Sequence, residues 1–239
     1  SSAVVLTSLF AEQLALESQA LDEDLSRGTE SFAESLHFLP EQADYRMTQE
    51  VYLDYLRRAK QAVKIPILAS LNGATSGGWV RYAKEMEHAG ADAIELNTYA
   101  LATDRSQTAR EVELQLLDLV EGVCRAVKVP VSVKLSQSFT SIPHLAACLE
   151  DAGARGVVLF NRFYQPDFDI EALEVRPSLH FSTPSELLPR LHWAAILYGH
   201  TNMDIGVTGG VHSAEDVLKS IMAGGSVAMM ASALHIHGI

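Results

Sequence analysis

The sequence is poor in basic residues, in cysteine and in long apolar runs. Its 239 residues contain 18 Lys and Arg against 30 Asp and Glu, which gives a formal net charge of −12. This balance repels the phosphates of nucleic acids and of anionic lipid surfaces, so we expect neither nucleic acid nor a membrane as a partner. A small molecule is the partner that the composition favours.

Other scarcities narrow the class of protein further. No apolar stretch is long enough to span a bilayer, and no basic segment followed by an apolar one opens the chain. The two cysteines, Cys124 and Cys148, lie in helical patterns and lack the close spacing of a metal or redox pair. We interpret them as reduced core thiols of a cytoplasmic protein.

Two interleaved repeats reveal the architecture. The segments AVKIPILASLN (62–72) and AVKVPVSVKLS (126–136) resemble each other, and so do AGADAIELN (89–97) and AGARGVVLFN (152–161). Each pair recurs after about 64 residues, the length of two βα units. Such alternation predicts an α/β fold with a parallel sheet and helical crossovers. With 48% apolar residues, residues 1–239 are long enough for a single domain with a large core.

Seven strands can be counted, at 3–8, 66–71, 92–97, 130–135, 156–161, 203–208 and 226–231. An open nucleotide-binding sheet would carry G-x-G-x-x-G after its first strand, which is absent, so we favour a (β/α)8 barrel. On this interpretation the chain lacks the first barrel strand and a C-terminal helix. We then expect open sheet edges, low stability and self-association, of which a homodimer is one form. Two stretches, 9–48 and 162–183, are too long for simple connections.

Polar residues stand at the C-terminal ends of these strands. Asn72, Asn97 and Asn161 end three of them, Lys134 lies near the end of a fourth, and Gly209-Gly210 follow a fifth. The carboxyl ends of parallel strands meet at one rim, where barrel enzymes place their active sites. The pattern therefore predicts a shared site.

The last two strands carry a candidate phosphate site. Gly209 and Gly210 permit close backbone approach and lead into a helix whose free N–H groups favour an anion. Ala231 and Ser232 offer a second small-residue loop beside them. The alternative is that the glycine pair only makes a tight turn.

Lys134 and the asparagines form a second group of candidates. Lys134 at the barrel mouth would stabilise negative charge on a ring or enolate, or form a Schiff base; the alternative is a solvated lysine. Asn72, Asn97 and Asn161 can donate to and accept from a planar heterocycle, although single asparagines at such places often start turns. His235 and His237 lack a third nearby ligand, so we expect no metal site.

The ordered motifs ADAIELN, VPVSVKLS, GVVLFN and IGVTGGVHSAEDVLKSIMAGGSVAMMASAL resemble the flavin-binding barrel of dihydroorotate dehydrogenases over nearly the whole chain. The resemblance implies FMN as the cofactor. It implies that Asn97 contacts substrate, that Lys134 contacts the flavin ring, and that Asn161 contacts substrate or flavin. It also implies an FMN phosphate site made of Gly209, Gly210, Ala231 and Ser232, with Ser182 and Thr183 nearby.

The sequence departs from the family pattern at three places. Ala100 stands where the family has a cysteine or serine that removes a proton from the substrate, and Thr98, Tyr99 or Ser136 would need an activating partner to replace it. Thr7 stands where a lysine is frequent. Arg162 follows Asn161 in place of a small residue, and it would hold a substrate carboxylate or form a surface salt bridge.

These observations favour an FMN-dependent oxidoreductase that oxidises dihydroorotate or a related dihydropyrimidine in pyrimidine biosynthesis. In this interpretation Lys134, Asn97 and Asn161 are catalytic, and Asn72, Asn97, Asn161 and Arg162 bind substrate. Two alternatives stay open. One is a phosphate-sugar lyase or isomerase with Lys134 as its amine, and the other is a non-catalytic flavin-binding relative, suggested by Ala100.

Overall fold

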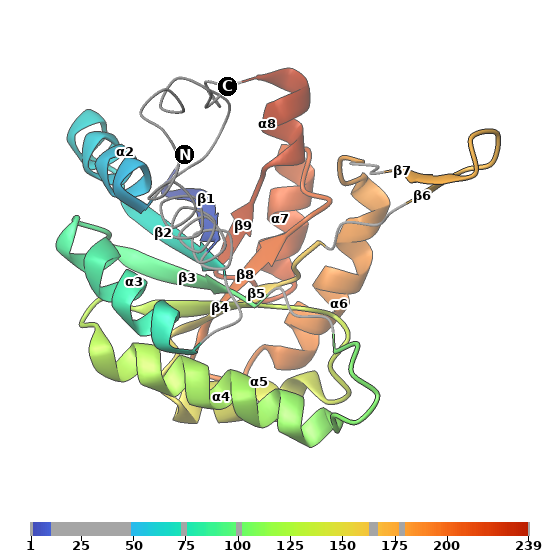
Figure 1. Ribbon diagram of the computed structural model, residues 1–239. Helices are drawn as coiled ribbons and strands as arrows, with labels where there is room; N and C mark the ends of the chain where they lie inside the picture. Colours follow the sequence, from blue (N-terminus) through green and yellow to red (C-terminus); the bar gives the residue numbers. More distant parts are fainter. Residues whose placement is uncertain are drawn as a thin grey trace, which may run out of the picture.

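A seven-stranded parallel sheet forms the centre of the computed structural model, which describes residues 2–10, 49–72, 76–98, 102–162, 167–176 and 180–238 (Figure 1). The strands follow one another in chain order, and the sheet curls as part of a barrel. The predicted α/β class and its seven barrel strands are confirmed. In spatial order the strands are β1 (Val4–Phe10), β2 (Ile67–Asn72), β3 (Ala93–Asn97), β4 (Val131–Leu135), β5 (Gly156–Leu159), β8 (Asp204–Thr208) and β9 (Val227–Met229).

Helices connect the strands and cover the outer face of the curl (Figure 1). Local sequence fixes where two of them begin: Thr108 and Glu111 form a capping box on α4, and Ser213 and Asp216 form another on α7, as Ser213 predicts. The helices are α2 (Gln49–Ala62), α3 (Ser76–His88), α4 (Ala109–Ala126), α5 (Ile142–Asp151), α6 (Leu187–Leu197), α7 (Ala214–Met222) and α8 (Ser232–His237), with a short 3-10 helix, η2 (Pro184–Glu186).

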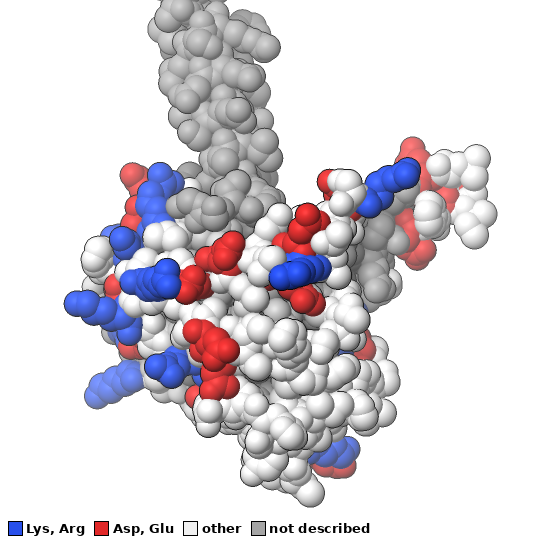
Figure 2. Space-filling model, turned by 90° about the horizontal axis from the view of Figure 1, so that it is seen from below, with Lys and Arg blue, Asp and Glu red and all other residues white. Residues whose placement is uncertain are grey.

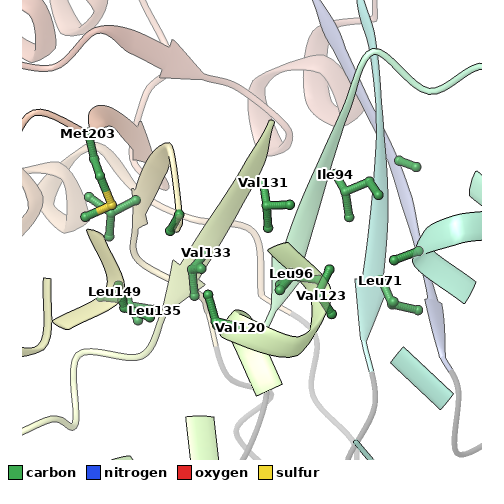
Figure 3. Close-up of a cluster of buried hydrophobic side chains, with 14 of the residues drawn as sticks. Leu71, Ile94, Leu96, Val120, Val123, Val131, Val133, Leu135, Leu149 and Met203 are labelled. Carbon is green, nitrogen blue, oxygen red and sulfur yellow. The ribbon is translucent and has the colours of Figure 1, made fainter. Parts of the chain in front are cut away.

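Each central strand has one face for the helices and one for the interior of the curl. Successive side chains of a strand point to opposite faces. The apolar members, among them Leu96 and Val133, pack against Val120 and Val123 of α4 in the buried cluster shown in Figure 3. Toward the C-terminal ends of β2, β3 and β4, the alternate members are polar, namely Ser70, Asn72, Glu95, Asn97, Ser132 and Lys134. The inner side of the curl therefore carries side chains that can form hydrogen bonds and ion pairs.

Strand register places these inward residues in level rows. Asn72 pairs with Asn97, and Asn97 pairs with Lys134. One row deeper, Ser70 pairs with Glu95 and Glu95 with Ser132. The rim row and the row beneath it therefore each bring side chains from three strands together.

Some expected boundaries differ in the structure. The strand expected at 156–161 ends at Leu159, so Asn161 lies two residues beyond it, and the strand expected at 226–231 is only Val227–Met229. Of the stretch 9–48, residues 11–48 lie outside the described residues. The stretch 162–183 contains a hairpin of β6 (Asp167–Asp169) and β7 (Glu174–Arg176) that projects from the body (Figure 1).

The cysteines correct one prediction in part. Both are unpaired thiols, but both are half-buried, and only Cys124 packs against the core cluster. Cys148 lies on the more exposed side of α5, where its Sγ is 3.7 Å from Nε2 of His144. Burial raises the pKa of the Cys124 thiol to about 11, which makes it a poor nucleophile at neutral pH.

None of the described helices is long and apolar enough to cross a membrane. On the face shown in Figure 2, acidic and basic side chains of the described residues are interspersed.

Candidate functional site

The rim of the sheet carries a hydrogen-bonded pair of asparagines. Asn161 Nδ2 donates to Oδ1 of Asn97 at 2.6 Å, and Asn97 Nδ2 donates to Oγ of Ser8 at 3.2 Å. Asn72, Asn97 and Asn161 are all buried. The structure thus brings Asn97 and Asn161 into contact and sets Asn72 and Lys134 beside Asn97 in the same row.

A second polar chain lies one row deeper and was not predicted. Ser8 Oγ lies 2.7 Å from Oγ of Ser70, whose hydroxyl lies 3.4 Å from Oε1 of Glu95. The same Glu95 oxygen forms an ion pair with Nζ of Lys134 at 3.3 Å. Glu95 is buried, and its other oxygen, Oε2, has no hydrogen-bond partner among the described residues.

Ser8, and not Thr7, occupies the inner side of β1 near the position where the family pattern has a lysine. Thr7 is exposed, whereas its neighbour Ser8 contacts both Ser70 and Asn97. The register of β1 shifts between Val5 and Ser8, and this irregularity brings Ser8 level with Ser70. Ser8 is therefore the residue that β1 contributes to the interior.

Tyr52 of α2 contacts the backbone of Ser70, the central residue of this polar chain. Its hydroxyl donates to the carbonyl of Ser70 at 3.2 Å and accepts from the Ser70 N–H at 3.0 Å. Burial raises the pKa of Tyr52 to about 12, and the nearby Glu95 carboxylate adds to the increase. The phenol is thus kept neutral and able to donate.

The substitutes considered for the missing base have other bonds. Thr98 Oγ1 donates to the carbonyl of Lys134 at 2.7 Å, and Ser136 Oγ accepts from the N–H of Ser138 at 3.1 Å. Neither bond supplies a group that would activate the hydroxyl for proton removal. Tyr99 and Ala100 lie outside the described residues.

The glycine pair after β8 has the backbone conformation that its sequence suggests. Gly209 and Gly210 have φ of +86° and +83°. A Cβ on Gly210 would lie 2.5 Å from the backbone N of Leu187, and one on Gly209 would lie 2.8 Å from Nε of Arg190. Only glycine fits this turn, because a Cβ at either position would collide with α6.

Arg190 packs beneath this loop and was not predicted. It is 2% exposed, its Nε donates to the carbonyl of Thr208 at 2.6 Å, and it forms an ion pair with Glu186. Burial lowers the pKa of Arg190, an effect that Glu186 opposes. The cation braces the loop and adds positive charge under it.

Three side chains gather beside the glycine loop. Ser232 Oγ accepts from the N–H of Ser182 at 3.0 Å and from its hydroxyl at 2.9 Å, and Ser182 Oγ lies 3.3 Å from Nε2 of His212. Ser182 and Ser232 were predicted together and are in contact, whereas His212 was missed. Ala231 precedes α8, and Thr183 caps η2 with Glu186.

The sequence left two contacts open for Arg162, a substrate carboxylate or a surface salt bridge, and the structure contains the salt bridge. Its Nε donates to Oε2 of Glu186 at 3.1 Å, and the side chain is 38% exposed. The salt bridge is present at the edge of the site. Contact with a substrate carboxylate stays a prediction.

The chemistry of these groups suits FMN. The loop of Gly209 and Gly210, with the hydroxyls of Ser182 and Ser232, suits a phosphate. The rim side chains of Asn97, Asn161 and Lys134 suit a planar polar ring. In the described part of the chain, no cluster of three or more His, Cys, Asp or Glu suitable for a metal occurs.

Comparison with known proteins agrees with this geometry. Residues 45–239 match the family model described as dihydroorotate dehydrogenase. Dihydroorotate dehydrogenase A (fumarate) of Limosilactobacillus reuteri is 30% identical over 182 residues, 73% of this chain and 58% of that protein. The catalytic subunit of dihydroorotate dehydrogenase B (NAD(+)) of Bacillus cereus is 30% identical over 176 residues, 71% of this chain and 56% of that protein. The chain thus spans less than two thirds of the length of these relatives. By its sequence and its fold, it belongs to the dihydroorotate dehydrogenase family.

Proposed function

We propose that the protein binds FMN at the C-terminal rim of its sheet and acts as an FMN-dependent dehydrogenase on CH–CH donors. The substrate class is dihydroorotate or a related dihydropyrimidine, within pyrimidine biosynthesis. The observation that carries the proposal is the polar rim, where Asn97 lies level with Lys134 and accepts a hydrogen bond from Asn161. The family relationship supports the same assignment.

Each group has a role that follows from its chemistry. Gly209, Gly210, Ser182, Ala231 and Ser232 would hold the phosphate, with Thr183 beside them. Lys134 would place a positive charge near the ring, and Asn97 and Asn161 would orient ring and substrate through hydrogen bonds, with Asn72 and Arg162 at the substrate edge. When bound, FMN supplies hydride acceptance, while the protein positions the reactants.

The family relationship argues against a phosphate-sugar lyase or isomerase. The Nζ atom of Lys134 is also held in an ion pair with Glu95, a contact that a Schiff base at this lysine would have to replace. A non-catalytic flavin-binding relative remains the second candidate. The observation that favours it is Ala100 at the place where the family has a base.

Flavin absorbance and substrate reduction test these candidates in sequence. The purified protein is titrated with FMN, and the loaded protein is mixed with dihydroorotate without oxygen. Bound flavin that bleaches supports the dehydrogenase, and bound flavin that stays oxidised with every dihydropyrimidine tried supports the non-catalytic relative. Failure to bind FMN would refute both.

A further inference from the structure

The buried carboxylate of Glu95 is a charged group beneath the rim that the proposed function does not use. It lies beneath the rim row, because Glu95 precedes Asn97 by two residues on the same face of β3. Its Oε1 contacts Lys134 Nζ and Ser70 Oγ, and its Oε2 has no partner among the described residues. Glu95 is 1% exposed.

Such a group is expensive for the folded protein. A buried acceptor without a hydrogen bond destabilises the folded state, and the attraction within a buried ion pair seldom offsets the desolvation of its two charges. Well-packed apolar residues at both positions would stabilise the barrel as well or better. The pair is therefore better explained by what its charges do than by stability.

The geometry shows what the carboxylate acts on. Lys134 is 19% exposed on its side chain and stands in the rim row, while Glu95 is almost fully enclosed behind it. The single ion-pair contact of 3.3 Å leaves the ammonium able to approach a ligand on its open side. A negative charge at this distance offsets part of the positive charge that Lys134 presents to the rim.

We propose that Glu95 is a positioning residue that fixes the Lys134 ammonium in the rim row and attenuates its charge, and thereby sets the reduction potential of the bound flavin. This inference rests on the proposed binding of FMN. Reduction adds negative charge to the isoalloxazine ring, and a cation beside the ring favours the reduced form. Glu95 weakens that preference.

The test is the reduction potential of FMN bound to the wild-type protein and to Glu95→Gln. Gln keeps the shape of the side chain and removes its charge. We expect E95Q to bind reduced FMN about tenfold more tightly relative to oxidised FMN, which equals a rise of about 30 mV for a two-electron couple. Glu95→Asp keeps the charge and is expected to return the potential toward that of the wild type. If Glu95 acted through packing alone, E95Q would keep the wild-type potential, because Gln fills the same space as Glu. The shorter side chain of E95D would then shift the potential.

Ser132→Ala is the matched control, because Ser132 lies in the same row as Glu95 on the next strand and carries no charge. We expect it to change the affinity ratio less than twofold. Should E95Q not fold, Lys134→Met is compared with the double variant K134M/E95Q. Both are expected to have the same potential, below that of the wild type, because Glu95 acts through Lys134.

The outcomes separate the two proposals. If the wild type binds no FMN, the proposed function is refuted, and this inference with it. If FMN binds but E95Q leaves the potential unchanged or, in its place, K134M and K134M/E95Q differ in potential, the inference alone is overturned. A wild-type potential in E95Q together with a shifted one in E95D would likewise overturn it.

Discussion

Asn161 Nδ2 donates a 2.6 Å hydrogen bond to Oδ1 of Asn97 and so joins two residues that are 64 positions apart. Asn97 ends β3 and Asn161 follows β5, so the bond passes over the end of β4, where Lys134 lies. One contact therefore ties together the ends of two strands that are not neighbours in the sheet.

Replacement of Asn97 by Ala should destabilise the protein and impair its chemistry. The change removes the acceptor for Asn161 and the donor to Ser8, and it leaves a buried amide unpaired at a cost of about 1–3 kcal/mol. Urea unfolding measures this loss. Asn202→Ala is the control, since its exposed amide donates only to Glu150, and its effect should be less than half as large. Equal losses would contradict a special role for the rim pair.

Two glycines with similar backbone angles should respond very differently to alanine. Gly210 has φ of +83° and Gly199 has φ of +77°, but a Cβ on Gly199 would meet nothing within 4 Å. Gly199→Ala should therefore cost about 1 kcal/mol of backbone strain. Gly210→Ala adds a collision with the backbone of Leu187 and should cost at least twice as much. Thermal unfolding compares the two, and similar shifts in Tm would show that the loop yields to the new methyl group.

Tyr52 predicts a distinctive loss of stability at alkaline pH. Its pKa is raised to about 12 in the folded state from about 10 in the unfolded chain, so the folded state favours the neutral phenol. The associated stability is fully present below pH 10 and is lost as the pH rises toward 12, on the order of 2 kcal/mol in total.

The comparison of Tyr52→Phe with the wild type over pH 9–12 isolates this effect. The wild type should lose more stability than the variant across this range. Tyr55→Phe serves as the control, because Tyr55 is 46% exposed and should follow the wild type. Parallel curves for Y52F and the wild type would disprove the assignment.

Ser232 should contribute to anion binding through its own proton. A hydroxyl offers one donor and two acceptors, and both recorded bonds of Ser232 Oγ, from the N–H and the hydroxyl of Ser182, are accepted. Its proton is left for a phosphate. We expect Ser232→Ala to raise the Kd for FMN about tenfold, the value of one hydrogen bond to a charged group. Fluorescence titration measures this, and Ser106→Ala, on the exposed loop before α4, should leave the Kd unchanged.

The sequence was sufficient for the strands and for the tips that end them. Asn72, Asn97 and the glycine pair stand out because each interrupts an apolar run at its end. Ser70 and Glu95 were missed although a period of two, counted back from Asn72 and Asn97, leads directly to them. The residues on either side of Ser70 and of Glu95 are apolar, so each stands as a single polar residue within an apolar strand.

Other members of the site could not be found from local pattern. Arg190 reaches the glycine loop from a helix 19 residues earlier, and its place depends on the packing of α6 against β8. His212 approaches Ser182 only because the chain returns to the same end of the sheet. Ser8 depends on the irregular register of β1. These are tertiary relationships, which no periodicity encodes.

The division of each strand into an apolar face and a polar face has a consequence for how such a protein can diverge. Positions such as Leu96 and Val133 anchor the helices, while Asn97 and Lys134 beside them belong to the polar row on the inner side of the curl. Substitutions at these inner positions can therefore change the polar row while the core between strands and helices keeps its residues. A relative with a new specificity would differ from this chain at alternate residues of its strands.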